Sequence, residues 1–507
     1  MAYYLGVRTE RTGFVSEVLD PNLKRITRPV LNAFRGRPPV VQRLVLQMPR
    51  PRLDSLYAFR DSVLQAGWLH SEANPAFPVH CIFGEYEFQG ELQLREGPAE
   101  ELALMRWPFR LRTAAGDTLY DMRSFDMVPV NGIEAAYSWL MQNALGGSGS
   151  PTYGHAMVEL QLNREDLGLY TLEGRTDSTS IAKWGRGPGP VLRFDDALLA
   201  GTRAAMENRL FGSLPLPQGD WLAAPIIVSG TINEEDEQAD PRTTDAMEQL
   251  EAFRSGSVAL SNVLDVPSTA RMFALADLLG GQRTTHWWNL RFLPDTATGV
   301  LIPFPLKAHA GEPIESISAL QLGIPITFRP KGPELADRLF NDTAFYNHYI
   351  AYLDTFVQDG WLEALLARLG ARAGQYEKVI SAEYPQERMD TTIFLHDRTV
   401  IQQTLRPRDL VLAYTQNRQG DRRRLALANV HALPVQAIGV VSGTDTVPFP
   451  RPVLLLPRET DKPLSYTIVN IRIPKEEAGH ERLLVQLVGL KEMRSMAIRN
   501  WSTFTAN

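Results

Sequence analysis

Three short segments of this chain carry side chains that could bind anions or move protons. The segment LGLYTLE ends on the carboxylate of Glu173, and the segment FRLRT places Arg110 and Arg112 on the polar face of one strand. A guanidinium group can hold a phosphate through two parallel hydrogen bonds. The segment TTHWWN contributes His286, whose usual pKa suits acid–base work, together with Asn289.

Each of these groups also has an interpretation without a functional role. Glu173 can be an ordinary surface residue. Arg112 can be a solvated strand residue, and Arg110 is an equal rival for any role on that face. Asn289 can tie its loop together by hydrogen bonds. His286 stands beside two tryptophans and can be a packed core histidine.

The element that must position Glu173 is a β-hairpin. Residues 163–166 form a turn cluster between the alternating runs VELQL and LGLYTLE. A stretch rich in Gly and Pro, 185–190, leads from this hairpin to a second short strand, VLRF. Upstream, FRLRT and TLYDMRSFDM predict strands, and residues 133–145 predict a helix that stops at two glycines.

A helix and a second hairpin flank the loop that carries His286 and Asn289. Residues 264–280 predict a helix, with Asp265 as its cap, a proline in its first turn and two glycines after its end. The runs HWWNLRFL and VLIPF then predict a hairpin around residues 294–299.

The rest of the chain divides into a mixed beginning and a β-rich end. The first 40 residues show little periodicity, and a strand (VQRLVLQMP), a helix (52–67) and an antiparallel pair of strands follow. Residues 196–260 predict mostly helix with an acidic loop at 234–240, and residues 334–370 predict two helices. From about residue 410, short β-like runs separated by turn residues predict a separate β-sandwich.

Composition places the chain among folded proteins and excludes several classes. Of 507 residues, 44% are hydrophobic and 22% charged, with a net charge of -6, which does not favour nucleic-acid binding. The only cysteine, Cys81, cannot form an intrachain disulfide and is expected to be a small buried side chain. No signal peptide and no long apolar run is visible, so the chain as written is expected to be soluble.

Four segments together resemble the CotH (spore-coat protein H) kinase family, especially its longer, membrane-associated members. The resemblance runs from about residue 40 to 320 and loosely beyond. The segments that carry it are MRWPFRLRTAAGDTLYDMRSF, LNREDLGLYTLE, GPGPVLRFDD and ADLLGGQRTTHWWNLRFLPDTATGVLIPF. The resemblance implies an α+β chain with an atypical two-lobed, protein-kinase-like fold at 96–405, an N-terminal α/β region at 1–95 packed on it, and a β-sandwich-like domain at 406–507.

The resemblance also implies roles for particular residues. ATP is the implied cofactor, with Arg110 or Arg112 offering a cation to its phosphates and Glu173 beside the adenine. The loop with His286 and Asn289 would be the catalytic loop. Phosphoryl transfer needs such a cation, a carboxylate near the accepting hydroxyl, and metal ligands.

Departures from the family pattern argue against catalysis. Family members carry an Asp in a segment resembling I-G-F-D, where this chain has Pro305, which cannot hold Mg²⁺. The TTHWWN loop has no carboxylate. Arg112 and Arg193 stand where kinases favour Lys. Lys307 and His309 follow the missing Asp and either place positive charge where the metal would have been or are two solvated loop residues.

Three hypotheses follow. The first is a CotH-like pseudokinase or binding scaffold with a protein partner and, by resemblance, a place at the bacterial cell envelope. The second is an active ATP-dependent transferase that draws carboxylates from elsewhere. Its candidates are Asp177, Asp195, Asp196 and Glu312. The third places function in the β-rich tail, which would bind a carbohydrate or a partner protein while the rest of the chain acts as a platform.

Overall fold

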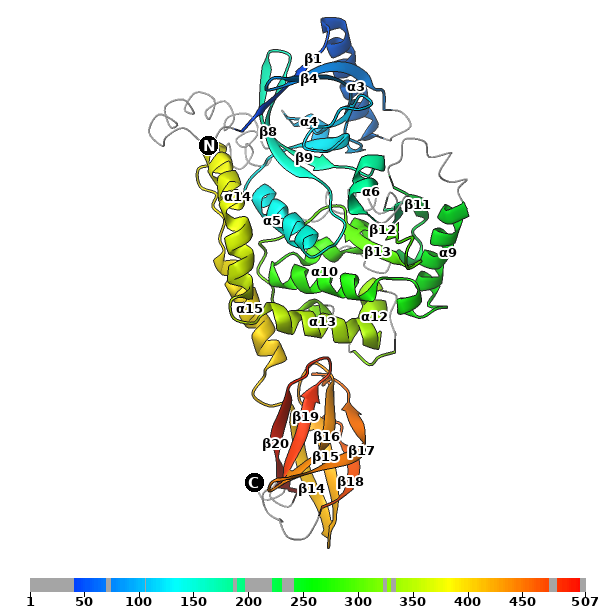
Figure 1. Ribbon diagram of the computed structural model, residues 1–507, viewed down its shortest axis with the longest axis vertical. Coiled ribbons are helices and arrows are strands. Elements are labelled where there is room, and N and C mark those ends of the chain that lie inside the picture. The colour runs from blue at the N-terminus through cyan, green and yellow to red at the C-terminus, as the bar shows by residue number, and fades with distance from the viewer. Residues whose placement is uncertain are drawn as a thin grey trace, which may run out of the picture.

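The protein combines helices and sheets in an α+β arrangement, as predicted (Figure 1). The computed structural model describes residues 41–69, 74–104, 106–185, 189–196, 221–229, 241–321, 326–329, 334–473 and 481–501. The acidic segment 234–240 and the first 40 residues, for which the sequence made predictions, lie outside this described part. No helix within it is both long and apolar enough to cross a membrane.

Seven strands near the N-terminal end close into a barrel, in the order β1-β3-β4-β6-β7-β9-β8. Apolar side chains alternate along each strand and fill the interior, as Phe109 and Leu111 do on β6. The polar residues between them, Arg110 and Arg112, lie on the outer face, as their spacing predicts. The strands are β1 (Arg43–Gln47), β3 (Phe77–Phe83), β4 (Tyr86–Leu94), β6 (Phe109–Thr113), β7 (Ser124–Pro129), β8 (His155–Leu162) and β9 (Glu165–Gly174).

The predicted hairpin is confirmed as β8 and β9, and its turn shows why these residues form it. Asn163 adopts a left-handed conformation with φ 52°, which Asn tolerates better than most residues. Its side-chain oxygen accepts a hydrogen bond from the Met48 backbone N–H at 2.8 Å. The hairpin therefore attaches to the strand that closes the barrel, and it delivers Glu173 to the opposite end of β9.

The boundary predicted at residue 95 falls inside this barrel. Strands β4 and β6, which lie on either side of it, pair along Gly90–Thr113 to Leu94–Phe109. Both strands also contribute to one buried apolar cluster. Residues before 95 are therefore part of the same sheet and not a separate layer packed on it, because strands distant in sequence can pair across a long connection.

Helix α5 (Glu134–Gly147) lies between the barrel and the helical part of the molecule (Figure 1). Its predicted span, 133–145, agrees with the observed one within two residues. Helix α14 (Trp361–Glu383) runs beside it, and the rings of Trp139 and Tyr376 meet edge to face at 5.4 Å. Helix α5 is thus fixed on both sides, by the barrel and by a helix more than 200 residues later in the chain.

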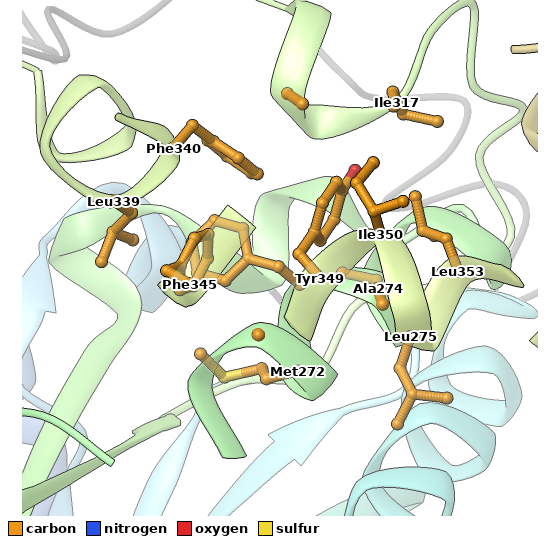
Figure 2. Packing of buried hydrophobic residues seen from close by; sticks show 14 of the residues in the cluster. Met272, Ala274, Leu275, Ile317, Leu339, Phe340, Phe345, Tyr349, Ile350 and Leu353 are labelled. Atoms are coloured by element: carbon orange, nitrogen blue, oxygen red, sulfur yellow. The ribbon is translucent and has the colours of Figure 1, made fainter. Parts of the chain in front are cut away.

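The helix predicted at 264–280 is α10 (Val266–Leu278), and its signals act as expected. Asp265 caps it by accepting a hydrogen bond from the Ser268 backbone N–H at 3.0 Å. Figure 2 shows that Phe345 and Tyr349 of α13 (Thr343–Phe356) face Met272 and neighbouring residues of α10. This helix pair is the centre of the larger apolar core.

After α10 the chain forms two short 3₁₀ turns and then the predicted hairpin. The turns are η5 (Gln282–Thr285) and η6 (Trp287–Asn289). Strands β12 (Leu290–Pro294) and β13 (Leu301–Pro305) pair antiparallel within a four-stranded sheet of order β11-β10-β12-β13. The remaining elements here are β10 (Leu192–Phe194), β11 (Ile226–Val228), α6 (Ser178–Trp184), α9 (Pro241–Ser255), η4 (Leu260–Asn262), α11 (Ser318–Gln321), α12 (Leu335–Phe340) and α15 (Thr392–Leu405). Those beside the barrel are α3 (Arg50–Ala66), α4 (Glu100–Ala103), β2 (Trp68–Leu69) and β5 (Gly97–Pro98).

The C-terminal part is β-rich, at the end of the molecule opposite the barrel (Figure 1). Its strands follow one another in the order β17-β16-β19-β20-β14-β15-β18. Strand β20 joins two groups of strands, because its residues 493–497 pair with β19 and its residues 498–500 pair with β14. The contact of this C-terminal part with α13 is close, since a side chain at Gly489 would meet Ile350 at 2.7 Å. The strands are β14 (Val411–Gln419), β15 (Arg422–Asn429), β16 (Val435–Ser442), β17 (Asp445–Leu455), β18 (Thr467–Arg472), β19 (Arg482–Leu487) and β20 (Met493–Asn500).

Candidate functional site

A cavity of about 440 Å³ opens where the barrel, α5 and the loop after β13 meet. One wall is the end of β7 and the start of α5, and a second is the adjoining ends of β8 and β9. The loop Leu306–His309 forms the third wall, and Glu387 closes one side. The cavity therefore collects residues from five parts of the chain, and Glu173 and Lys307 are the two predicted site residues among them.

Glu173 and Lys307 form a loose ion pair across this cavity. The Nζ atom of Lys307 lies 3.9 Å from Oε2 of Glu173, and the two side chains are 43% and 29% exposed. Solvent-exposed pairs of this kind contribute about 0–1 kcal/mol to stability. The pair therefore holds the lysine side chain only weakly, and both groups remain accessible from the cavity.

A second pair, Glu134 with His309, lies at the first turn of α5. Nδ1 of His309 is 3.4 Å from Oε1 of Glu134. The interaction with His309 lowers the pKa of Glu134, and the nearby cations Arg283 and Lys307 lower it further, against the opposing effect of partial burial. Glu134 is therefore a carboxylate at neutral pH, as its position in the first turn of a helix also favours.

The backbone of the loop is held far more firmly than its side chains. Nδ2 of Asn289 donates to the Lys307 carbonyl at 2.7 Å, and Oδ1 of Asn289 accepts from the Lys307 backbone N–H at 2.9 Å. The Thr284 hydroxyl bonds the N–H and the carbonyl of His309 in the same way. Asn289 thus holds the backbone of Lys307 in place. This is the loop-tying role that the sequence allowed for it.

His155 is a cavity residue that the sequence did not single out. It is paired in register with Glu173 on the neighbouring strand, so both side chains lie on the outer face of the barrel. Burial lowers the pKa of His155, and the nearby carboxylate of Glu173 only partly counteracts this. Its Nδ1 atom is buried without a hydrogen-bond partner. The hairpin register, once known, is the signal that places it opposite Glu173.

Glu387 is a second residue that only the structure brings to the cavity. Its carboxylate accepts a hydrogen bond from the Ile133 backbone N–H just before α5. This approach needs a glycine at position 132, where φ is 156° and a side chain would lie 2.3 Å from Oε2 of Glu387. Glu387 comes from the segment after α14, more than 250 residues away, so no local pattern could have indicated it.

The predicted arginines are spread over two other places. Arg110 lies in the same transverse row as Glu173, with Asp126 between them, and bonds Asp126 at 3.0 Å and also Glu96. Burial raises the pKa of Asp126, but the Arg175 and Arg110 guanidinium groups outweigh this and lower it overall. Two strand spacings of about 4.8 Å separate Arg110 from Glu173.

Neither of the other two arginines lines the cavity. Arg112 is the next outward-facing residue of β6 after Arg110, and it pairs in register with Glu91 on β4 and Ser124 on β7. Arg193, on β10, pairs with Asp195 at 3.2 Å and with Asp196 at 2.9 Å. The structure thus brings Lys307, and not Arg112 or Arg193, to Glu173.

His286 also lies outside the cavity. Its ring packs on Trp288 at 4.4 Å, and burial lowers its pKa to about 4. The imidazole is therefore neutral at physiological pH, and it is half-buried against Trp288, so the packing role that the sequence allowed fits it better than acid–base work.

The other carboxylates considered from the sequence are engaged elsewhere. Asp177 caps α6 by accepting from the Ser180 backbone N–H at 2.8 Å. Glu312 pairs with Arg283. Across the described part of the chain, no three His, Cys, Asp or Glu side chains gather as a metal-binding group.

Pro305 is the last residue of β13 and is buried opposite Leu290. It has no side-chain oxygen to offer a metal, and it directly precedes the loop that carries Lys307. Cys81 is buried inside the barrel as expected, and burial raises the pKa of its thiol to about 12, so it is not a thiolate nucleophile at neutral pH.

Comparison with models of known protein families and with curated proteins finds no match to this chain.

Proposed function

We propose that this protein is a degenerate relative of the CotH kinase family that binds a small ligand in the cavity and does not transfer phosphate. The order of parts along the chain supports this: five strands of the barrel, then α5, the hairpin of β8 and β9 that completes the barrel and carries Glu173, helix α10, a loop, and a second hairpin that leads into the cavity. A protein partner and an association with the bacterial cell envelope belong to the same proposal and rest on the sequence resemblance alone.

The observation that carries the proposal is the lysine ammonium beside Glu173. Phosphoryl transfer needs carboxylates that hold a divalent cation against the phosphates. Here Lys307 provides the positive charge at Glu173, and Pro305 stands where the resemblance expects the metal-binding Asp. A tethered ammonium neutralises a carboxylate but cannot bridge two phosphates as a metal ion does.

The test is a transfer assay with the full chain. Purified protein is incubated with labelled ATP, Mg²⁺ or Mn²⁺, and candidate acceptor proteins, and we expect no label above background. Transfer that disappears in Glu173→Ala and persists in Arg112→Ala would overturn the proposal. Arg112 is the matched control because it lies on the outer face of the same barrel and away from the cavity.

A further inference from the structure

We propose that the ligand of this cavity is a small aliphatic amine, such as a diamine, whose ammonium group replaces that of Lys307 at Glu173. This inference rests on the proposed function in one respect, that the cavity is the ligand site. It adds the chemical class of the ligand, which the sequence resemblance would have assigned differently, as a nucleotide.

The charge balance of the cavity favours a cation. Among the described residues that line it are three carboxylates, those of Glu134, Glu173 and Glu387, and one lysine, Lys307. Glu134 also lies 3.8 Å from Arg283 and 3.4 Å from His309 at the edge of the cavity, whereas Glu173 and Glu387 have no arginine partner among the ion pairs of the described residues. His155 is neutral because burial lowers its pKa. The carboxylates therefore outnumber the cations, so the cavity attracts an ammonium group more than a triphosphate.

Lys307 already shows how an ammonium group fits, and its side chain is easy to displace. The separation of 3.9 Å between Nζ and Oε2 is at the outer limit of an ion pair, and both partners contact solvent. Its backbone is held independently by Asn289. The lysine side chain can therefore swing into solvent without moving the loop, which leaves the Glu173 carboxylate free for another cation.

The cavity walls suit an alkyl chain that carries such cations. Val128, Ile133, Leu306 and Tyr153 supply apolar surface, and about 440 Å³ lies within the usual range for a small-molecule site. A second carboxylate lies near the first, because Glu134 lines the same cavity and Lys307, the partner of Glu173, also acts electrostatically on it. A short diamine can therefore place one ammonium at each carboxylate.

The experiment is calorimetric titration of the full chain at low salt with putrescine, and with 1,4-butanediol as a neutral control of the same length. We expect putrescine to bind and butanediol not to bind. We expect Glu173→Gln to weaken putrescine binding by about tenfold or more, because a hydrogen bond to a charged group is lost. Glu87→Gln, on the outer surface of β4 and outside the cavity, is the matched control and should leave the affinity unchanged.

A second variant should change the affinity for putrescine in the opposite direction. Lys307→Met removes the competing ammonium but keeps the loop backbone, so we expect putrescine to bind more tightly to it than to the wild type. Tighter binding on loss of a positive charge would not arise if Lys307 served an anion. Because this variant alters an exposed side chain, it also keeps the test decisive if Glu173→Gln fails to fold.

Three outcomes overturn the inference, and all differ from failure of the proposed function. The first is equal binding of putrescine and butanediol, and the second is weaker putrescine binding to Lys307→Met. The third is binding of ATP, lost in Lys307→Met, with no binding of putrescine, which would keep the cavity as a ligand site but assign it an anion. The proposed function itself fails only if phosphate transfer is observed, or if no small ligand of either class binds.

Discussion

Two carboxylates in this protein, Asp277 and Glu173, have contrasting surroundings. Asp277, in α10, is fully buried and accepts hydrogen bonds from the Ser318 backbone N–H at 3.0 Å and hydroxyl at 2.6 Å. It also accepts from Gln282 at 2.8 Å and from the Tyr349 hydroxyl. Glu173, at the cavity, is partly exposed and has two long contacts, with the Thr171 hydroxyl at 3.4 Å and with a flexible lysine at 3.9 Å.

The difference separates a carboxylate that holds the fold together from one that can still bind a ligand. A buried carboxylate with four donors has no capacity left for a ligand, and it fixes the elements that supply those donors. Through Gln282 and Ser318, Asp277 fixes the start of η5 and the start of α11. A partly exposed carboxylate with long, loose contacts contributes little to stability but can exchange its cation.

The largest effect should come from removing Asp277. In Asp277→Ala the donors from Ser318, Gln282 and Tyr349 lose their acceptor inside the core, so we expect the free energy of unfolding to fall by about 3 kcal/mol or more. Denaturant unfolding followed by tryptophan fluorescence measures this. Glu363→Ala, which removes an exposed partner of Arg398, is the control and should shift the transition little.

A pH dependence should come from Asp397, a second fully buried carboxylate. Burial raises its pKa from 3.8 to about 6. The folded protein thus keeps this proton to higher pH than the unfolded chain does, so ionisation opposes folding and stability falls as pH rises from about 4 to about 6.

The size of this loss is on the order of 3 kcal/mol. Thermal unfolding across the pH range would measure it, and in Asp397→Asn the contribution of this residue to the slope should vanish. An Asn variant with the same fall in stability between pH 4 and 6 would show that another group is responsible.

A smaller effect is expected at Asn289, which links the two regions. Asn289→Ala removes the amide that holds the Lys307 backbone, and we expect a loss of about 1–2 kcal/mol. Hydrogen exchange of the Lys307 amide should accelerate as well. If stability falls but this exchange rate does not change, Asn289 does not position the loop.

The smallest effect should come from the cavity pair itself. Glu173→Gln should change the free energy of unfolding by less than about 1 kcal/mol, because the pair is exposed and long. Differential scanning calorimetry of this variant beside Asp277→Ala tests the contrast directly. Equal losses in the two variants would mean that Glu173 is a structural carboxylate like Asp277, and the division of roles drawn above would be wrong.

Local sequence patterns predicted much of the framework. The turn at Asn163, the cap at Asp265 and the hairpin of β12 and β13 are all confirmed, because each depends on residues within a few positions of one another. The outward orientation of Arg110 and Arg112 follows in the same way from the alternation of a strand.

The composition of the cavity could not be predicted in this way. Glu173 and Lys307 were recognised as candidates, but Arg112 and Arg193 were expected beside them and lie elsewhere. His155 was missed because its relation to Glu173 depends on the register of two strands.

The chain therefore specified its turns, caps and strand faces locally, whereas the tertiary structure decided which charges share a cavity. Closing the barrel joined strands on both sides of residue 95, and the docking of α14 beside α5 brought Glu387 to Ile133. The physical reason is that the two kinds of interaction act over different distances along the chain. Backbone preferences act over a few residues, but a binding site is made by side chains that packing brings together from distant parts of the chain.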